Sequence, residues 1–286
     1  MTTLPCPSVP PTTWTAESAR RYFMRLAGIT TTPACPKCDE HTTYGLRDGR
    51  FRCSRCKYTF HCFSRRWINR GNLPPEYWAI ILVAFIDGKP VANTADALKL
   101  TYQTVYKAFM TIRLAILAQH PDVAARLLDN RNEPVKYCPN IEDDDDAVCL
   151  ECRSPVFGVA EEAGIVRMQM LPGRAARDVF SLPLALKTWR TMVYCEATPP
   201  WDTLLFCCCK KAKRIFFSKF TDKSFRFDQG QFRSFSETWL HHYHCLSPEM
   251  SHLYIAELVL RFNIAEQEQF SILAKHLLSF VPKRND

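Results

Sequence analysis

Residues 35–60 read CPKCDEHTTYGLRDGRFRCSRCKYTF and contain four cysteines in two Cys-x-x-Cys pairs. The pairs, Cys35 with Cys38 and Cys53 with Cys56, are separated by fourteen residues. Each turn of this kind presents two thiolates to one side, so two turns together can close a tetrahedral zinc site. Redox chemistry through one Cys-x-x-Cys is the weaker interpretation, because two matched pairs favour a closed four-sulfur site. The stretch therefore predicts a zinc ribbon with a structural Zn²⁺.

Between the two cysteine pairs the sequence predicts a β-hairpin. Residues 42–46 and 50–53 have the composition of short strands, and the Arg-Asp-Gly sequence between them is a turn signal. We expect zinc to supply the folding energy that so small a domain cannot obtain from a core, which does not compete with a binding role. The hairpin would carry four arginines outward, namely Arg47, Arg50, Arg52 and Arg55.

Positive charge is concentrated in the first part of the chain. Residues 1–120 carry 16 Lys+Arg against 7 Asp+Glu, whereas residues 121–286 carry 21 against 22. Such a density suits a polyanion whose counterions are released on binding, and the alternative is a solvated basic face. Basic residues are densest in the segment from residue 47 to residue 70, which contains one acid, Asp48. The basic residues of this segment are Arg47, Arg50, Arg52, Arg55, Lys57, Arg65, Arg66 and Arg70.

Three helical segments are predicted after the ribbon. Apolar spacing indicates helices at 73–88, 91–98 and 101–118, with Thr101 placed as an N-cap for the last. Two helices separated by so short a turn predict a helix-turn-helix, in which the second helix enters the DNA major groove. Its expected contacts with bases and phosphates are Tyr102, Gln103, Thr104 and Lys107.

Composition sets the class of protein. The chain has 286 residues, of which 47% are hydrophobic and 23% charged, an ordinary globular balance for two or three small domains. The longest apolar run, residues 77–86, has about half the length of a membrane-spanning helix, and no secretion signal is evident. The clearest of the 14 cysteines form metal-type pairs, which favours a reducing compartment. We expect an intracellular protein associated with DNA, in a bacterial cytoplasm or a nucleus.

The order of these motifs resembles a known family. CPKC, then YGLRDGRFRCSRCKYTF, then TYQTVYKAFMTIRLAIL is similar to the zinc-ribbon insertion-sequence transposases of the Merlin and ISXO2-like type, which are DDE transposases. PVFGV at 155–159, VYCEATPPWDTLLFCC at 193–208 and SPEMSHLYIAELVLRFN at 247–263 resemble later blocks of that family. The resemblance covers residues 20–280 and implies an RNase H-like catalytic domain that cuts and joins DNA.

Catalysis in that family requires three carboxylates that hold two divalent metal ions. The resemblance places the three positions at Cys138, Glu196 and Gly230, so one carboxylate of three is present. One carboxylate cannot hold two hard cations, and we therefore expect Mg²⁺ to bind only if the chain is active after all. Other acids could be recruited instead: Glu142 to Asp146, Glu161, Glu162, Asp202, Asp228 and Glu237.

The rear half of the chain predicts a mixed α/β domain by its own pattern. Residues 155–171 indicate a hairpin that turns at Ala163 and Gly164, residues 191–194 a buried strand, and residues 253–262 an amphipathic helix. Further metal ligands are possible but weaker interpretations. They are the incomplete set Cys138, Cys149 and Cys152, the pair His241 and Cys245, and the CCC sequence at 207–209.

Taken together, the sequence predicts an α+β multidomain protein: a zinc ribbon and a helix-turn-helix, followed by an RNase H-like α/β domain. The expected function is sequence-specific binding of double-stranded DNA by a transposase-derived protein that lacks strand transfer, with the rear domain as a scaffold or homodimer surface. The alternatives are an active transposase with displaced carboxylates and a zinc-ribbon adaptor for a protein partner. The expected segments are a tail and short helix (1–30), ribbon (31–66), helix-turn-helix (72–120), linker (121–140) and RNase H-like domain (141–286).

Overall fold

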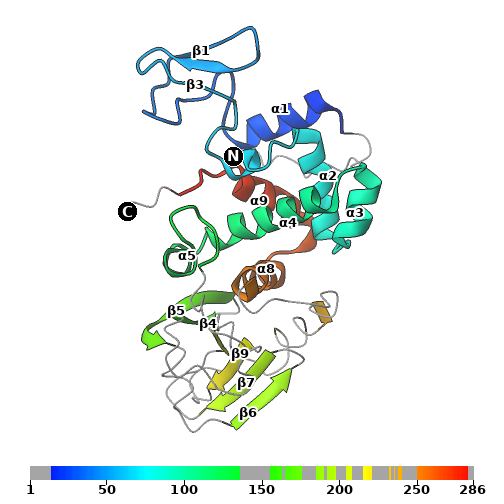
Figure 1. Ribbon diagram of the computed structural model, residues 1–286, viewed down its shortest axis with the longest axis vertical. Coiled ribbons are helices and arrows are strands. Elements are labelled where there is room, and N and C mark those ends of the chain that lie inside the picture. Colours follow the sequence, from blue (N-terminus) through cyan, green and yellow to red (C-terminus); the bar gives the residue numbers. More distant parts are fainter. Residues whose placement is uncertain are drawn as a thin grey trace, which may run out of the picture. The chain divides into compact units, whose positions relative to one another are not determined.

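The computed structural model forms two compact units (Figure 1). The front unit is built from described residues up to Ala115 and from Ala265–Pro282, and the rear unit from described residues between Ile116 and Ile264. The structure describes residues 14–135, 155–162, 165–175, 185–189, 192–197, 204–207, 215–220 and 250–282, together with Phe232, Phe235, Thr238 and Trp239.

A three-stranded antiparallel sheet forms the ribbon of the front unit. Its strands are β1 (Thr43–Gly45), β2 (Phe51–Cys53) and β3 (Thr59–Phe60), in the order β1-β2-β3. The predicted hairpin is confirmed, because β1 pairs with β2 in antiparallel register. The third strand was not predicted, since two residues are too few for an alternating pattern.

The three helices predicted after the ribbon begin and end close to the expected residues: α2 (Pro75–Ile86), α3 (Val91–Leu98) and α4 (Tyr102–Leu117), whose last two residues belong to the rear unit. The front unit also contains α1 (Ala16–Leu26), within the expected tail and short helix, and the 3₁₀ turn η2 (Trp67–Asn69), which was not predicted. Thr101 is confirmed as the N-cap of α4, since its Oγ1 accepts a hydrogen bond from the amide of Thr104 at 3.2 Å. Lys99 ends α3 in a left-handed conformation with φ 53°. None of the described helices combines the length and apolar character needed to cross a bilayer.

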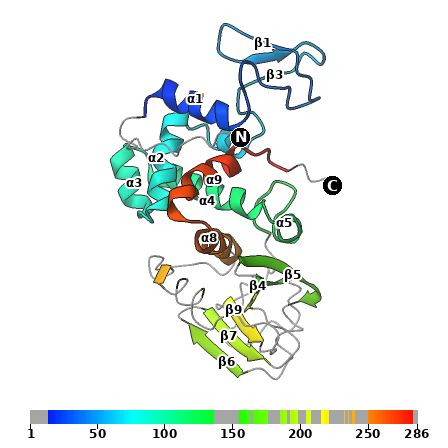
Figure 2. The same ribbon diagram turned by 180° about the vertical axis from the view of Figure 1, so that it is seen from behind.

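The front unit is completed by a helix from the other end of the chain. Helix α9 (Glu266–Leu278) packs against α1 and α2, and Figures 1 and 2 show it in red beside them. Phe270 stacks on Trp14 at a ring-centroid distance of 6.2 Å, and Leu273 and Leu277 are buried. This position differs from the prediction, which placed residues 141–286 in the rear domain, because the two residues between α8 and α9 carry no signal of a boundary.

The rear unit contains a six-stranded sheet in the order β5-β4-β8-β9-β7-β6. The β4–β5 hairpin is antiparallel, as predicted, and β7 runs parallel to β9. Helix α5 (Pro121–Leu127) occupies part of the predicted linker. The strands are β4 (Pro155–Glu162), β5 (Ile165–Ala175), β6 (Ala185–Trp189), β7 (Met192–Ala197), β8 (Leu204–Cys207) and β9 (Ile215–Phe220).

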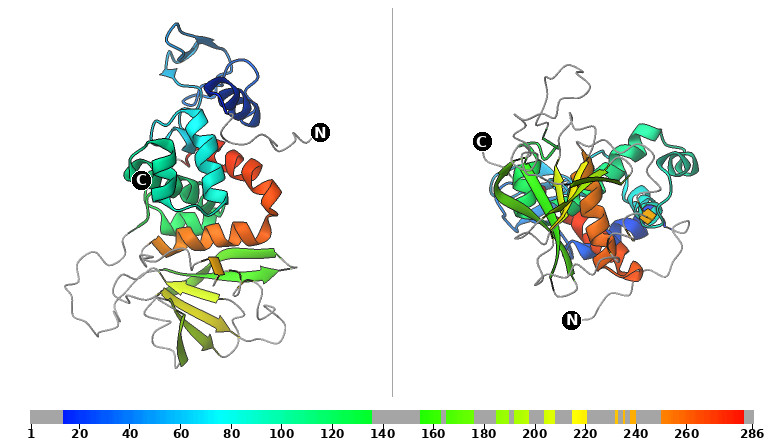
Figure 3. Two further views of the ribbon diagram at one scale, coloured as in Figure 1. Left: turned by 90° about the vertical axis from the view of Figure 1, so that its right-hand side faces the viewer. Right: turned by 90° about the horizontal axis from the view of Figure 1, so that it is seen from below.

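Helix α8 (Ser251–Asn263) packs on β5, as the left view of Figure 3 illustrates. Its last residue, Asn263, uses its side-chain amide as a strand would: Oδ1 accepts from the amide of Val166 at 2.9 Å and Nδ2 donates to the carbonyl of Val166 at 2.6 Å. Because β5 is the outermost strand of the sheet, this side chain satisfies backbone groups that an edge strand leaves open.

The burial of α8 differs from the predicted amphipathic pattern, because it extends around most of the helix. Even Glu257 and Arg261 are buried, with 1% and 4% of their side chains exposed, and they form an ion pair at 2.8 Å. The Arg261 guanidinium also lies 4.0 Å from the ring centroid of Trp239. A charge pair in this position depends on both partners, since one charge left alone there would have lost its water without compensation.

We predict that Glu257→Gln destabilises the protein by about 3–5 kcal/mol, because it removes the carboxylate that pairs with the buried Arg261 guanidinium at 2.8 Å. The matched control is Glu17→Gln in α1, which breaks an ion pair of the same i,i+4 spacing at 3.5 Å whose side chains are 70% and 78% exposed. This control should cost at most about 0.5 kcal/mol. Urea denaturation measures both values, and equal effects would contradict the prediction.

Candidate metal centre and basic surface

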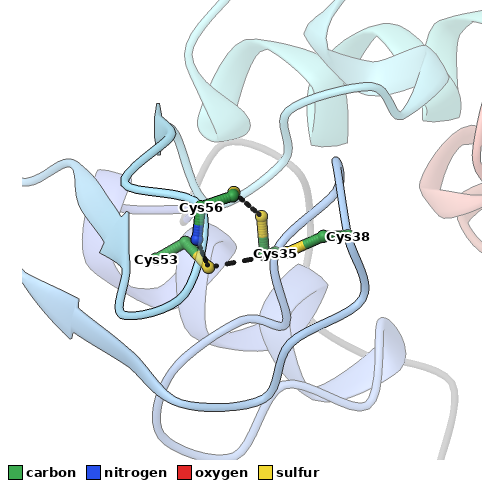
Figure 4. Close-up of side chains that lie close together, drawn as sticks. All are labelled: Cys35, Cys38, Cys53 and Cys56. Atoms are coloured by element: carbon green, nitrogen blue, oxygen red, sulfur yellow. Dashed lines mark hydrogen bonds between the residues drawn. The ribbon is translucent and has the colours of Figure 1, made fainter.

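The four cysteines of the ribbon converge on one point. Their Sγ atoms all lie within 4.8 Å of one another. The Sγ atoms of Cys35 and Cys56 are 3.6 Å apart, as are those of Cys38 and Cys53, so each pair joins the two halves of the site (Figure 4). A tetrahedron of sulfurs at the usual Zn–S distance has edges of about 3.8 Å. Four cysteines at this spacing fit a structural zinc ion.

The two Cys-x-x-Cys turns share one backbone feature. The residue after the second cysteine of each turn has a positive φ: Asp39 follows Cys38 with φ 55°, and Lys57 follows Cys56 with φ 59°. In the first turn the amide of Asp39 donates to the carbonyl of Cys35 at 2.9 Å, which closes the loop. Residues other than glycine seldom have this backbone conformation, so both turns depend on neighbouring contacts that hold them in it. Zinc bound by both turns would provide that constraint.

Burial, backbone amides and neighbouring sulfurs shift the pKa values of Cys53 and Cys38 in opposite directions. Burial raises the pKa of Cys53, but amide hydrogen bonds from Cys56, at 3.4 Å, and from Arg55 outweigh it and lower the pKa to about 7. The amide of Glu40 lowers the pKa of Cys38, whereas burial and the three neighbouring sulfurs raise it to about 12. Without a cation the cluster cannot collect thiolates at all four positions, because each negative sulfur opposes the next.

The packing of the ribbon separates a sulfur face from a basic face. Cys35, Cys53 and Phe60 are buried together, with Phe51 packed against them. On the opposite face Tyr44 pairs with Arg52 in the strand register, and side chains of directly paired residues project to the same side. The exposed lysines and arginines of the ribbon are Lys37 in the first Cys-x-x-Cys turn and Arg47, Arg50, Arg52, Arg55 and Lys57.

Two of these exposed cations are partly engaged within the ribbon. Arg50 forms an ion pair with Asp48, with Nε donating to Oδ2 at 2.7 Å. This contact raises the pKa of Arg50 and lowers that of Asp48. The ammonium of Lys57 donates to the carbonyl of Ser54 at 2.6 Å. Both side chains remain exposed, so they can exchange these contacts for an anionic partner.

Two tyrosines of the ribbon were missed by the sequence analysis. Tyr44 is 45% exposed and Tyr58 is 39% exposed, although both are large aromatic residues. Tyr58 stacks on Phe60 at a centroid distance of 6.0 Å, and Tyr44 lies on the basic face. The pairing of Tyr44 with Arg52 across the hairpin is the signal that could have indicated its outward direction, because Arg52 lies between the inward residues Phe51 and Cys53.

The predicted DNA contacts on α4 fall into two groups. Tyr102 is 52% exposed, and Gln103 and Lys107 are also exposed. Thr104 instead takes part in the helix cap, because its hydroxyl lies 2.8 Å from the Oγ1 of Thr101. The ring of Tyr102 stacks on that of Tyr106, with centroids 6.1 Å apart, a neighbour that the sequence analysis did not select.

The remaining predicted cations lie where the ribbon joins the helices, and they contact the protein itself. Arg65 and Arg66 are half-buried and bind backbone carbonyls, of Pro36 and Leu278 respectively. The guanidinium of Arg70 lies 5.3 Å from the ring centroid of Trp67. The structure therefore does not place these three side chains with the exposed group on the ribbon.

Of the three positions at which the family resemblance places catalytic carboxylates, one lies within the described residues. Glu196 is in β7, in register with Ala185 of β6 and Lys219 of β9. Cys138 and Gly230 lie outside the described residues, as do Cys149, Cys152, His241, Cys245 and the acids at 142–146, 202, 228 and 237. Glu161 and Glu162 end β4. Cys62, a further buried thiol outside the cluster, has a pKa raised by burial.

We predict that the purified protein binds one Zn²⁺ per chain and that Cys56→Ser abolishes stoichiometric binding, because three thiolates leave the tetrahedron incomplete. Cys62→Ser is the matched control, since Cys62 lies outside the four-sulfur cluster and should leave the zinc content unchanged. Elemental analysis after dialysis measures the metal directly. A full zinc content in Cys56→Ser would contradict the assignment.

Zinc affinity should fall as the pH is lowered. Zinc binds thiolates, so protons compete for the same sulfurs. Because the pKa of Cys53 is about 7, acidification below that value protonates this thiol too and adds a further competing proton. The plot of log affinity against pH should therefore rise with pH and be steeper below pH 7 than above it. A competition titration with a chelator tests this, and a flat profile would contradict it.

Comparison with known proteins gives one match, and it falls on this site. Residues 17–59 match the family of the transposase zinc-ribbon domain, of the IS1595 type, and this range includes all four cysteines and all of α1 except its first residue. The searches of curated proteins and of solved structures returned no match. The segment is thus similar to a transposase zinc ribbon, and the chain carries a transposase-related, zinc-binding module at its front.

Proposed function

We propose that this protein is a transposase-derived, sequence-specific binder of double-stranded DNA that lacks strand-transfer activity. The observation that carries the proposal is the zinc ribbon itself. It matches a transposase zinc ribbon at residues 17–59, and its six exposed lysines and arginines lie on a small module with a four-cysteine metal centre. DNA is the polyanion that such a module would meet in a transposase-related protein.

In this proposal the ribbon supplies phosphate contacts. Arg52 and its neighbour Tyr44 lie on one face, and Arg47 and Arg55 are exposed at the turns. Cations arranged in this way neutralise phosphates and release the counterions condensed on the duplex, which gives affinity without sequence preference. Phosphate contacts also fix the register of the protein on the duplex.

Sequence preference would come from α4, as the second helix of a helix-turn-helix formed by α3 and α4. The first turns of such a helix enter the major groove. Gln103 is exposed there and can donate and accept two hydrogen bonds with an adenine edge. Lys107, one turn later, can reach a guanine edge or a phosphate, and the exposed ring of Tyr102 can pack on a thymine methyl group.

The rear unit would serve as a scaffold or a homodimer surface with an RNase H-like fold. A mixed sheet with one parallel strand pair and a helix packed on its outermost strand supports this proposal. The loss of catalysis rests on the sequence. Of the positions Cys138, Glu196 and Gly230, only Glu196 is a carboxylate, and a two-metal reaction needs several oxygen ligands fixed around both ions.

We predict that in-vitro selection with the intact protein enriches one DNA sequence, whose binding weakens steeply with salt. Arg52→Ala should reduce the slope of log affinity against log salt concentration by about 0.9, the contribution of one phosphate contact. Gln103→Ala should instead reduce the preference for the selected site over random DNA by about 1–3 kcal/mol. Arg126→Ala, an exposed cation on α5, is the control expected to change neither.

Absence of DNA binding, together with a salt-tolerant complex with a protein, would overturn this proposal in favour of an adaptor role. Nicking of the selected DNA in Mg²⁺ or Mn²⁺ distinguishes an inactive transposase-derived binder from an active transposase with displaced carboxylates. We expect no nicking above background. Metal-dependent nicking that disappears in Glu196→Ala would mean that displaced carboxylates have rebuilt the active site.

A further inference from the structure

We infer that Arg65 and Arg66 are positioning residues, which tie the zinc ribbon to the helices through the C-terminal segment Leu278–Val281. We call this arrangement the clasp: Arg65, Arg66 and Trp67 on one side and the segment 278–281 on the other. The inference assigns a different task to two cations that the sequence pattern grouped with the DNA contacts. All residues of the clasp belong to the front unit.

Backbone hydrogen bonds form the frame of the clasp. The amide of Val281 donates to the carbonyl of Arg65 at 2.8 Å, and the amide of Trp67 donates to the carbonyl of Ser279 at 3.3 Å. Arg66 and Phe280 are thereby paired in an antiparallel bridge. The segment after α9 thus forms a single antiparallel bridge just before η2, and it connects residues more than 200 positions apart in the sequence.

The side chain of Arg66 reinforces the frame at two places. Its Nη1 donates to the carbonyl of Leu278, the last residue of α9, and its guanidinium lies 4.3 Å from the ring centroid of Phe280. The last carbonyls of a helix have no partner within the helix, and they carry its negative dipole end. A cation therefore stabilises α9 at this position. Burial lowers the pKa of Arg66, which is consistent with a side chain turned into the protein.

Arg65 carries the connection on to the metal centre. Its Nη1 donates at 2.6 Å to the carbonyl of Pro36, which lies between the zinc-site cysteines Cys35 and Cys38. Arg65 also has a left-handed backbone with φ 63°, a conformation that non-glycine residues adopt at a cost when the surroundings hold them in it. The path from Val281 to the metal-binding turn therefore consists of two hydrogen bonds and one residue.

This geometry predicts what the clasp does. The ribbon and α4 must present their cations to one duplex at the same time, and the affinity gained from two linked sites depends on the linkage. With the clasp closed, the ribbon has a fixed position relative to the helices of the front unit. With the clasp open, the chain around Arg65 becomes a flexible linker between the ribbon and the helices. The DNA affinity then approaches that of two binding modules joined by a flexible linker.

The first test measures the clasp without DNA. Arg66→Ala and Phe280→Ala should each increase hydrogen exchange at the amides of Trp67 and Val281 by at least tenfold, while the zinc content stays at one per chain. Phe280 is 51% exposed, so its truncation should leave the fold intact. The double variant should exchange little faster than Arg66→Ala alone, because the Phe280 ring acts through its contact with the Arg66 guanidinium. Lys275→Ala, on the exposed surface of α9, is the control.

The second test rests on the proposed DNA binding and uses the selected site. Phe280→Ala removes no charge, yet it should weaken binding about fivefold to tenfold. Arg66→Ala should weaken binding to the same extent and leave the salt slope unchanged, whereas loss of a phosphate contact lowers that slope by about 0.9. Arg52→Ala provides the slope change expected of a direct contact.

Three results would overturn the inference: unchanged amide exchange in both variants, a salt slope lowered by Arg66→Ala, or full DNA affinity in Phe280→Ala. If the wild-type protein binds no DNA, the proposed function fails, and the exchange experiment still decides whether the clasp exists. If wild-type binding is normal but the exchange rates do not change, the inference about the clasp fails alone.

Discussion

The four-sulfur centre is the constraint on which the front of this protein depends. The buried part of the ribbon is small, namely Cys35, Cys53 and Phe60, and so few residues bury too little apolar surface to offset the entropy of ordering the module. Sulfurs 3.6 Å apart across two strained turns would repel one another as thiolates. A divalent cation converts that repulsion into the main source of folding energy. The basic face then exists because the metal holds the strands that carry it.

Burial divides the basic residues of the front unit into two classes that composition cannot distinguish. Arg52 and Arg55 remain in water and keep their charge available to a polyanion. Arg66 has given up part of its hydration for a helix-terminal carbonyl and an aromatic ring. Exchanging these contacts for a phosphate would mean breaking the clasp, whereas Arg52 would lose only water. The energetic preference of each guanidinium thus follows from what already surrounds it.

Local patterns predicted most of the front unit, and long-range contacts account for what they missed. Cys-x-x-Cys spacing gave the metal ligands, and the prolines before α2 and Thr101 before α4 gave helix starts within one or two residues. The return of α9 was not predictable in this way, because it depends on the stacking of Phe270 on Trp14 across the chain. For the same reason no local signal at Arg65 indicates that Val281 will pair with it. In the rear unit, the amphipathic interpretation of α8 failed at Glu257, whose charge is paired inside the fold.

The clasp also has a thermodynamic consequence for the metal. Coupling between two sites is reciprocal, so if zinc at the ribbon favours the closed clasp, the closed clasp must favour zinc by the same factor. Arg65 is the residue through which this coupling passes, because its side chain fixes the carbonyl of Pro36 while its own carbonyl accepts the amide of Val281. In this proposal the segment 278–281 would contribute to a metal site more than 200 residues before it in the sequence. A module that matches a family on its own would then depend on α9 and the residues that follow it.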